Sequence, residues 1–178
     1  MAKKISMTLS RSSINDAINE LKAYKKELID KNELFVQRLL QVGVETSQVK
    51  LAESPLGRHV TISTDISSDR MGCKGILLAK GTVKQNPGYA PFSILLAIEF
   101  GAGIHYNPTP NPKADELGLG VGTFPGQTHA LDSGGWMYWD EDLQEWRHSY
   151  GVKATMPLYN ADIEMIQNIM KIANEVFS

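Results

Sequence analysis

A run of 29 residues without proline or glycine, from Ile14 to Val42, constrains the fold of this chain more than any other feature. Within the run, apolar residues recur every seven positions, at Ile14, Leu21, Leu28, Phe35 and Val42. This spacing places apolar side chains on one side of an α-helix. We therefore predict one helix of about 45 Å that is capped by Ser12 or Ser13 and stops at Gly43.

Seven-residue spacing also occurs in coiled coils, but Lys25 and Asn32 fall at positions that a coiled coil keeps apolar. A helix that lies across a sheet or a neighbouring subunit fits the pattern better.

The rest of the chain predicts short strands and a second helix. Residues 59–66 and 75–80 alternate as an antiparallel hairpin does, and residues 136–139 and 145–148 predict a second hairpin that carries the tryptophans. Residues 92–100 are apolar throughout, which leaves a buried strand and a short buried helix equally open. A last helix is expected from Pro157, with an apolar face formed by Ile163, Ile166, Ile169, Met170, Ala173, Val176 and Phe177.

The length of 178 residues predicts a single domain, residues 1–178. Residues 101–135 look like a loop, with Pro108, Pro110, Pro112 and Pro125 among many glycines. No apolar run is long enough for a transmembrane helix, and the first residues do not resemble a secretory signal. The single cysteine, Cys73, excludes an intramolecular disulfide and suggests folding in the reducing cytoplasm of a cell.

Charge is distributed unevenly along the chain. Residues 1–97 carry 14 Lys and Arg against nine Asp and Glu, a net charge of +5, whereas residues 98–145 have a net charge of −7. Such a polarised chain can pair the basic face of one copy with the acidic face of the next, although a solvated acidic loop explains the pattern equally well.

Candidate catalytic and ligand-binding groups are scattered. His59, His105, His129 and His148 show no short helical spacing, so a metal site would need His105, His129, His148 and Asp132 to meet in three dimensions. The glycines at 118–122 lack the strand and helix that a phosphate loop needs. Cys73 lacks a signature for a nucleophile, and Asp140, Glu141, Asp142 and Glu145 read as a solvated turn. We expect no metal, no cofactor and no enzyme activity.

Aromatic residues, in contrast, are concentrated. Eleven of the 14 lie between Tyr89 and Tyr159, including all three tryptophans, and they fall in the acidic part of the chain. That placement is the reverse of a groove for single-stranded nucleic acid. Aromatic residues with few catalytic partners favour packing or a protein interface.

At these residues the chain resembles a family of tailed-bacteriophage proteins, the small tail-completion or head–tail joining (neck) proteins of phages and prophages. The resemblance rests on the long N-terminal helix, on residues 98–102 (Ile-Glu-Phe-Gly-Ala), on the hairpin at 136–139 and on the proline step at 155–161. Many relatives join the second and fourth of these by a short hairpin, whereas about 45 extra residues intervene here. Met156 stands where arginine is common.

The resemblance implies an α+β fold, with the long N-terminal helix and a C-terminal helix packed on a small antiparallel sheet and residues 103–147 inserted as a long loop. It implies a virion protein that forms a ring, a hexamer, between the head and the tail tube. Its partners would be other neck, connector or tail-tube proteins, with DNA passing close by and no membrane. The acidic loop could meet a neighbouring subunit or line the channel.

Residues for an interface are Phe100, Trp136, Tyr138, Trp139 and Pro157, with Trp136 partly in the core and Trp146 in the core. Two alternatives to the ring remain: a metal-dependent hydrolase that uses the loop histidines, and a tail assembly chaperone that never enters the particle.

Overall fold

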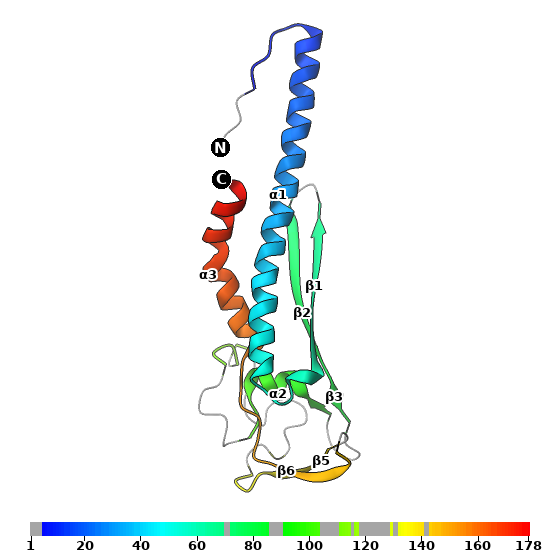
Figure 1. Cartoon of the computed structure of the whole chain (residues 1–178), viewed down its shortest axis with the longest axis vertical. Coiled ribbons are helices and arrows are strands. Elements are labelled where there is room, and N and C mark those ends of the chain that lie inside the picture. The colour runs from blue at the N-terminus through cyan, green and yellow to red at the C-terminus, as the bar shows by residue number, and fades with distance from the viewer. Residues whose placement is uncertain are drawn as a thin grey trace.

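The computed structural model describes residues 5–69, 72–85, 91–103, 111–114, 116–117, 129, 132–140 and 143–178. Its elements are α1 (Arg11–Ala52), a 3-10 turn (Gly57–His59), β1 (Val60–Ser68), β2 (Cys73–Gly81), β3 (Val83–Lys84), β4 (Phe92–Ser93), α2 (Ile94–Phe100), β5 (Trp136–Asp140), β6 (Glu145–Ser149) and α3 (Pro157–Phe177). This is the predicted α+β arrangement of two long helices and small antiparallel sheets (Figure 1).

Helix α1 is longer than the sequence predicts, because Gly43 does not end it and the helix continues to Ala52. Gly43 is buried where α3 crosses: a Cβ at this position would lie 2.7 Å from Sδ of Met165. The glycine therefore lets the two helices approach closely. The N-cap is Ser10 and not Ser12 or Ser13, and its hydroxyl accepts a hydrogen bond from Ser13 N–H at 3.3 Å.

Helix α1 lies between α3 on one side and the β1–β2 hairpin on the other (Figure 1). On the α3 side, the rings of Phe35 and Phe177 are 5.9 Å apart, and Arg38 pairs with Glu175 at 2.9 Å. On the hairpin side, a Cβ added to Gly75 would meet Val36. The sheet therefore covers one side of α1, while α3 packs on α1 and not on that sheet.

The predicted first hairpin is confirmed. Strands β1 and β2 pair antiparallel from Val60↔Gly81 to Ser68↔Cys73. Because side chains alternate between the two faces of a strand, one face of this ribbon turns towards α1 and the other faces away from it.

Residues 92–100 combine both structures that the sequence left open. Strand β4 pairs with β3, and its Ser93 caps α2 by accepting the Leu96 N–H bond at 3.4 Å. Every turn of the short helix is buried: Ile94 and Ile98 form a core cluster with Leu51 at the end of α1. A seven-residue helix is marginal in water, so this burial stabilises it.

The second predicted hairpin is also confirmed, since β5 and β6 pair from Trp136↔Ser149 to Asp140↔Glu145. Much of the insertion at 103–147, including the glycines at 118–122, lies outside the described residues. Within the described residues, neither long helix has an apolar stretch of the length and purity needed to cross a membrane.

Candidate functional site

The two segments that carry the phage resemblance meet in space, around the side chain of Glu99. Its carboxylate accepts hydrogen bonds from Leu158 N–H at 2.9 Å and Tyr159 N–H at 3.0 Å, the first free amides of α3. The side-chain amide of Asn111 donates a third at 2.7 Å. The N-cap residue Met156 makes no side-chain capping bond. Glu99 therefore caps α3 from another helix, where a negative charge also interacts favourably with the helix dipole.

Backbone contacts hold the same junction together. Thr155 N–H donates to the carbonyl of Ile98 at 3.0 Å, and Ala102 and Val152 form an isolated β-bridge. Gly151 adopts φ +124°, and a Cβ there would collide with the carbonyl oxygen of Ala102. Only glycine satisfies both the dihedral and the approach. The motif at 98–102 and the step at 155–161 thus form one structural unit that starts α3.

Burial raises the pKa of Glu99 above its ordinary value, and the bonds from Leu158, Tyr159 and Asn111 lower it in part. The carboxyl is surrounded by backbone and by an amide, and its three bonds tie together α2, α3 and the segment at 111. This is the environment of a structural cap, since all three partners donate to it.

The five predicted interface residues separate into two groups. Phe100 is 5% exposed and Pro157 is fully buried, so both pack inside the subunit. The other three lie on β5, where Trp136 and Tyr138 are half-buried and Trp139 is 42% exposed. Only the β5 residues present apolar surface that a neighbour could cover.

The core prediction for Trp146 is wrong. Its side chain is 64% exposed and packs edge-on against Trp139 across the hairpin, with ring centroids 5.7 Å apart. In a two-stranded hairpin without a covering element, one face of each strand meets solvent. The pair Trp139–Trp146 forms an exposed aromatic surface at the lower end of the molecule in Figure 1.

The described residues do not bring the candidate metal ligands together as one group. His129 Nδ1 lies 2.8 Å from Oδ2 of Asp132, and the ring of His148 contacts that of Tyr150 edge-on. His105 falls outside the described residues. Among the residues described, no three His, Cys, Asp or Glu side chains are grouped as metal ligands. Asp140 accepts a hydrogen bond from Leu143 N–H and thus shapes the hairpin turn, but its side chain is only 13% exposed and is not solvated as predicted. Residues 141 and 142 of the predicted solvated turn lie outside the described residues.

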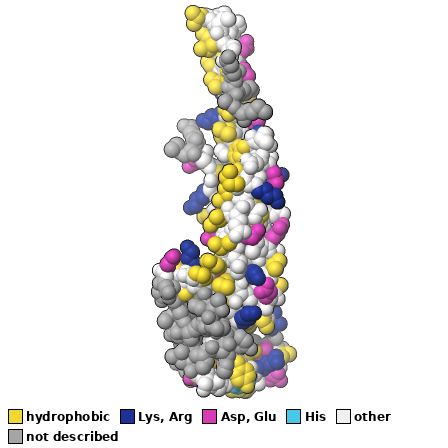
Figure 2. Space-filling model, turned by 90° about the vertical axis from the view of Figure 1, so that its left-hand side faces the viewer, with side chains coloured by type: hydrophobic (Ala, Val, Ile, Leu, Met, Phe, Trp, Pro, Cys, Tyr) yellow, Lys and Arg dark blue, Asp and Glu magenta, His cyan; other side chains and the backbone are white. Residues whose placement is uncertain are grey.

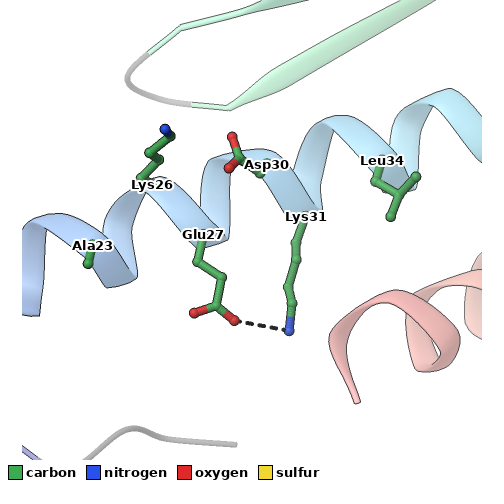
Figure 3. A pocket seen from close by; sticks show the side chains of 6 residues that line it. All are labelled: Ala23, Lys26, Glu27, Asp30, Lys31 and Leu34. Carbon is green, nitrogen blue, oxygen red and sulfur yellow. Dashed lines mark ion pairs between the residues drawn. The ribbon is translucent and has the colours of Figure 1, made fainter.

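A hollow of about 380 Å³ lies along α1 (Figure 3). All six lining residues belong to this one helix: Ala23, Lys26, Glu27, Asp30, Lys31 and Leu34. The ion pair between Glu27 and Lys31, at 3.4 Å, is solvent-exposed on both sides. All the lining side chains come from one helix, so the hollow is an open surface feature and not a cleft that encloses a ligand.

Large apolar side chains are exposed along part of the described surface. Helix α1 extends beyond the ends of α3 and of the β1–β2 hairpin, beside the segment that precedes it (Figure 1), and we call residues 11–28 the arm. Ile14, Ile18, Leu21 and Leu28 on the arm are 37–55% exposed. Of the five buried residues in α1, only Ala17 is on the arm. The upper part of the heptad row is therefore uncovered, while Phe35 in the same row contacts α3.

The single apolar face predicted for α3 is in fact two faces, one buried and one exposed. Ala161, Ile172 and Val176 are buried. The outer face of α3, formed by Tyr159, Ile163, Ile166, Met170, Ala173 and Phe177, repeats at intervals of four and three residues. Ile166 is 56% exposed and Met170 is 70% exposed. The alternating 4-3 spacing was visible in the sequence and is the signal of a helix-packing seam.

Comparisons with protein-family models, with curated proteins and with solved structures each found no significant match.

Proposed function

We propose that this chain is a structural subunit of the neck or tail of a tailed bacteriophage or prophage-derived particle. In this proposal, copies of the chain form a ring, a hexamer, that completes the tail and joins it to the head. Its partners are neck, connector and tail-tube proteins, and DNA passes through the ring.

The observation that supports this proposal is the amount of apolar surface on an elongated subunit. The arm, the outer face of α3 and the Trp139–Trp146 pair all expose large apolar side chains. Exposed apolar side chains that gather on one surface mark interaction sites more often than single scattered ones do. A subunit of a larger assembly accounts for all three surfaces.

The junction around Glu99 adds a second argument. It joins the two segments that carry the phage resemblance and gives each a physical role: residues 98–102 supply the cap, and residues 155–161 start the capped helix. The insertion between them, with the acidic excess, is then free to serve a contact or to line the channel, where a negative wall repels DNA phosphates.

The test is the composition of purified particles. We expect quantitative mass spectrometry of virions to find several copies of this chain per particle, and we expect deletion of its gene to leave filled heads and unattached tails. Absence of the chain from particles whose assembly needs it would identify a chaperone instead. One bound zinc per chain that is lost in His129→Ala would identify a metal enzyme.

A further inference from the structure

The arm of α1 and the outer face of α3 are uncovered in the subunit, and their geometry is complementary. Both are helical faces with apolar residues at intervals of three, four and seven positions. Figure 2 shows hydrophobic side chains along the arm and further down on the same side of the molecule. One face of the subunit therefore carries both halves of a helix–helix contact.

We infer that two copies of this chain pair antiparallel through a twofold axis, with the outer face of α3 of each copy packed on the arm of the other. This contact is separate from those of the proposed ring, because it uses the arm and the outer face of α3 and leaves the Trp139–Trp146 pair uncovered. It covers both faces on both copies, because a twofold contact is isologous and closes on itself.

The lengths of the two faces agree. Helix α3 ends at Phe177, which lies beside Phe35 of α1. The part of α1 before Phe35 is 24 residues long, about 36 Å, and α3 is 21 residues long, about 31 Å. A twofold axis at the level of Phe35 and Phe177 therefore places α3 of one copy beside the part of α1 that precedes Phe35 in the other copy.

The register that follows from this axis matches apolar residues with apolar residues. Leu21 lies 14 residues before Phe35, and Ile163 lies 14 residues before Phe177. Leu28 and Met170 each lie seven residues before the same two positions. Because both helices rise equally per residue, Leu21 faces Ile163 and Leu28 faces Met170 in the pair.

Charge agrees with this register. In a parallel helix seam, a residue beside the apolar row pairs with a residue five positions further along on the other helix. Asp162 of α3 and Lys25 of the arm occupy such positions. When Leu21 and Leu28 form the row, Lys25 lies beside the row and not in it, so its ammonium group can pair with the carboxylate of Asp162 in the second copy.

The segment before α1 turns back along the arm (Figure 1), and its Met7 and Leu9 are themselves 65% and 96% exposed. With this segment in place, Ile14, Leu21 and Leu28 remain 37–55% exposed, whereas Ala17 is buried. The three exposed side chains are the ones that the second copy covers.

The first experiment measures association of the full chain by sedimentation. The double variant Ile166→Lys/Met170→Lys adds two charges to the outer face of α3, at side chains that are more than half exposed in the subunit. We expect the dissociation constant of the pair to rise at least about 100-fold. The control, Gln167→Lys/Asn174→Lys, adds the same charge at exposed polar positions of the same helix, and we expect no more than a few-fold change. Circular dichroism checks that both variants are folded.

The second experiment tests the register by crosslinking in a Cys73→Ser background. We expect a short bismaleimide to join Leu21→Cys of one copy to Ile163→Cys of another when the two proteins are mixed. Gln37→Cys, on an exposed position of α1, is the matched control and should not be joined to Ile163→Cys. A wild-type monomer of 19.7 kDa at every concentration would overturn the inference. So would an assembly that the two lysines leave intact, or a mixture in which the control is joined as well as Leu21→Cys.

Discussion

At the scale of single residues, the buried side chain of Glu99 joins three segments of the chain by hydrogen bonds. Its three hydrogen bonds hold α2, α3 and the segment at 111 in one unit. A glutamate is required there because both of its oxygens accept bonds. The opposing effect is burial, which disfavours the charged form and raises the pKa of the carboxyl.

The first prediction concerns Glu99→Gln. A glutamine offers one acceptor oxygen, so its NH₂ group must face one of the three donors, and we expect a loss of about 1–3 kcal/mol in the free energy of unfolding. Because the folded-state pKa of Glu99 is raised, its contribution to stability is complete below its ordinary pKa of 4.5 and declines as pH rises through the folded value. The stability gap between wild type and variant should therefore narrow as pH rises.

Urea unfolding at a series of pH values from about 4 to 7 measures this gap. The other titrating groups are common to both proteins, so their contributions cancel in the stability difference between wild type and variant. A gap that stays constant or widens with pH would contradict the prediction.

Other residues show what a sequence pattern can and cannot predict. The helices and both hairpins follow from apolar periodicity and from the polar residues between the strands. The predicted helix stop at Gly43 is wrong. A sequence pattern alone does not distinguish a glycine that ends a helix from one that lets a second helix approach closely. The sequence pattern also does not predict the cap by Glu99, because its partners Leu158 and Tyr159 lie 59 and 60 positions further along the chain.

At the scale of elements, the β5–β6 hairpin presents Trp139 and Trp146 to solvent. The second prediction is that Trp139→Ala prevents assembly and leaves the subunit folded. Removing a fully buried tryptophan costs about 3–5 kcal/mol, and Trp139 should cost clearly less because 42% of it is exposed. Thermal unfolding measures the stability of the variant, and particle assembly in a complementation experiment measures its function.

Trp146→Ala is the matched control, because it removes the same edge-on ring contact from the opposite strand. If both variants lose assembly equally, the ring pair acts as a unit. If Trp139→Ala unfolds the subunit, or assembles as wild type does, the interface lies elsewhere.

At the scale of the whole molecule, side-chain packing is uneven along α1. Below the arm the subunit has a core: α2 packs under the end of α1, and α3 and the β1–β2 hairpin flank the rest of that helix (Figure 1). The arm has only Ala17 buried. Isolated helices of this length are marginal in water, since most helix stability in proteins comes from packing of an apolar face. The arm needs a partner to be as stable as the part of α1 below it.

This asymmetry gives the last prediction, which hydrogen exchange can measure peptide by peptide. In dilute protein, amides of residues 14–28 should exchange much faster than those of residues 36–51 in the same helix, because local opening of the arm breaks few packed contacts. At concentrations where copies associate, the arm should become protected, while residues 36–51 change little and act as the internal control. The Ile166→Lys/Met170→Lys variant should abolish only the concentration-dependent protection of the arm. Equal protection along α1 at every concentration would show that the arm is stable alone and that its apolar row needs no second copy.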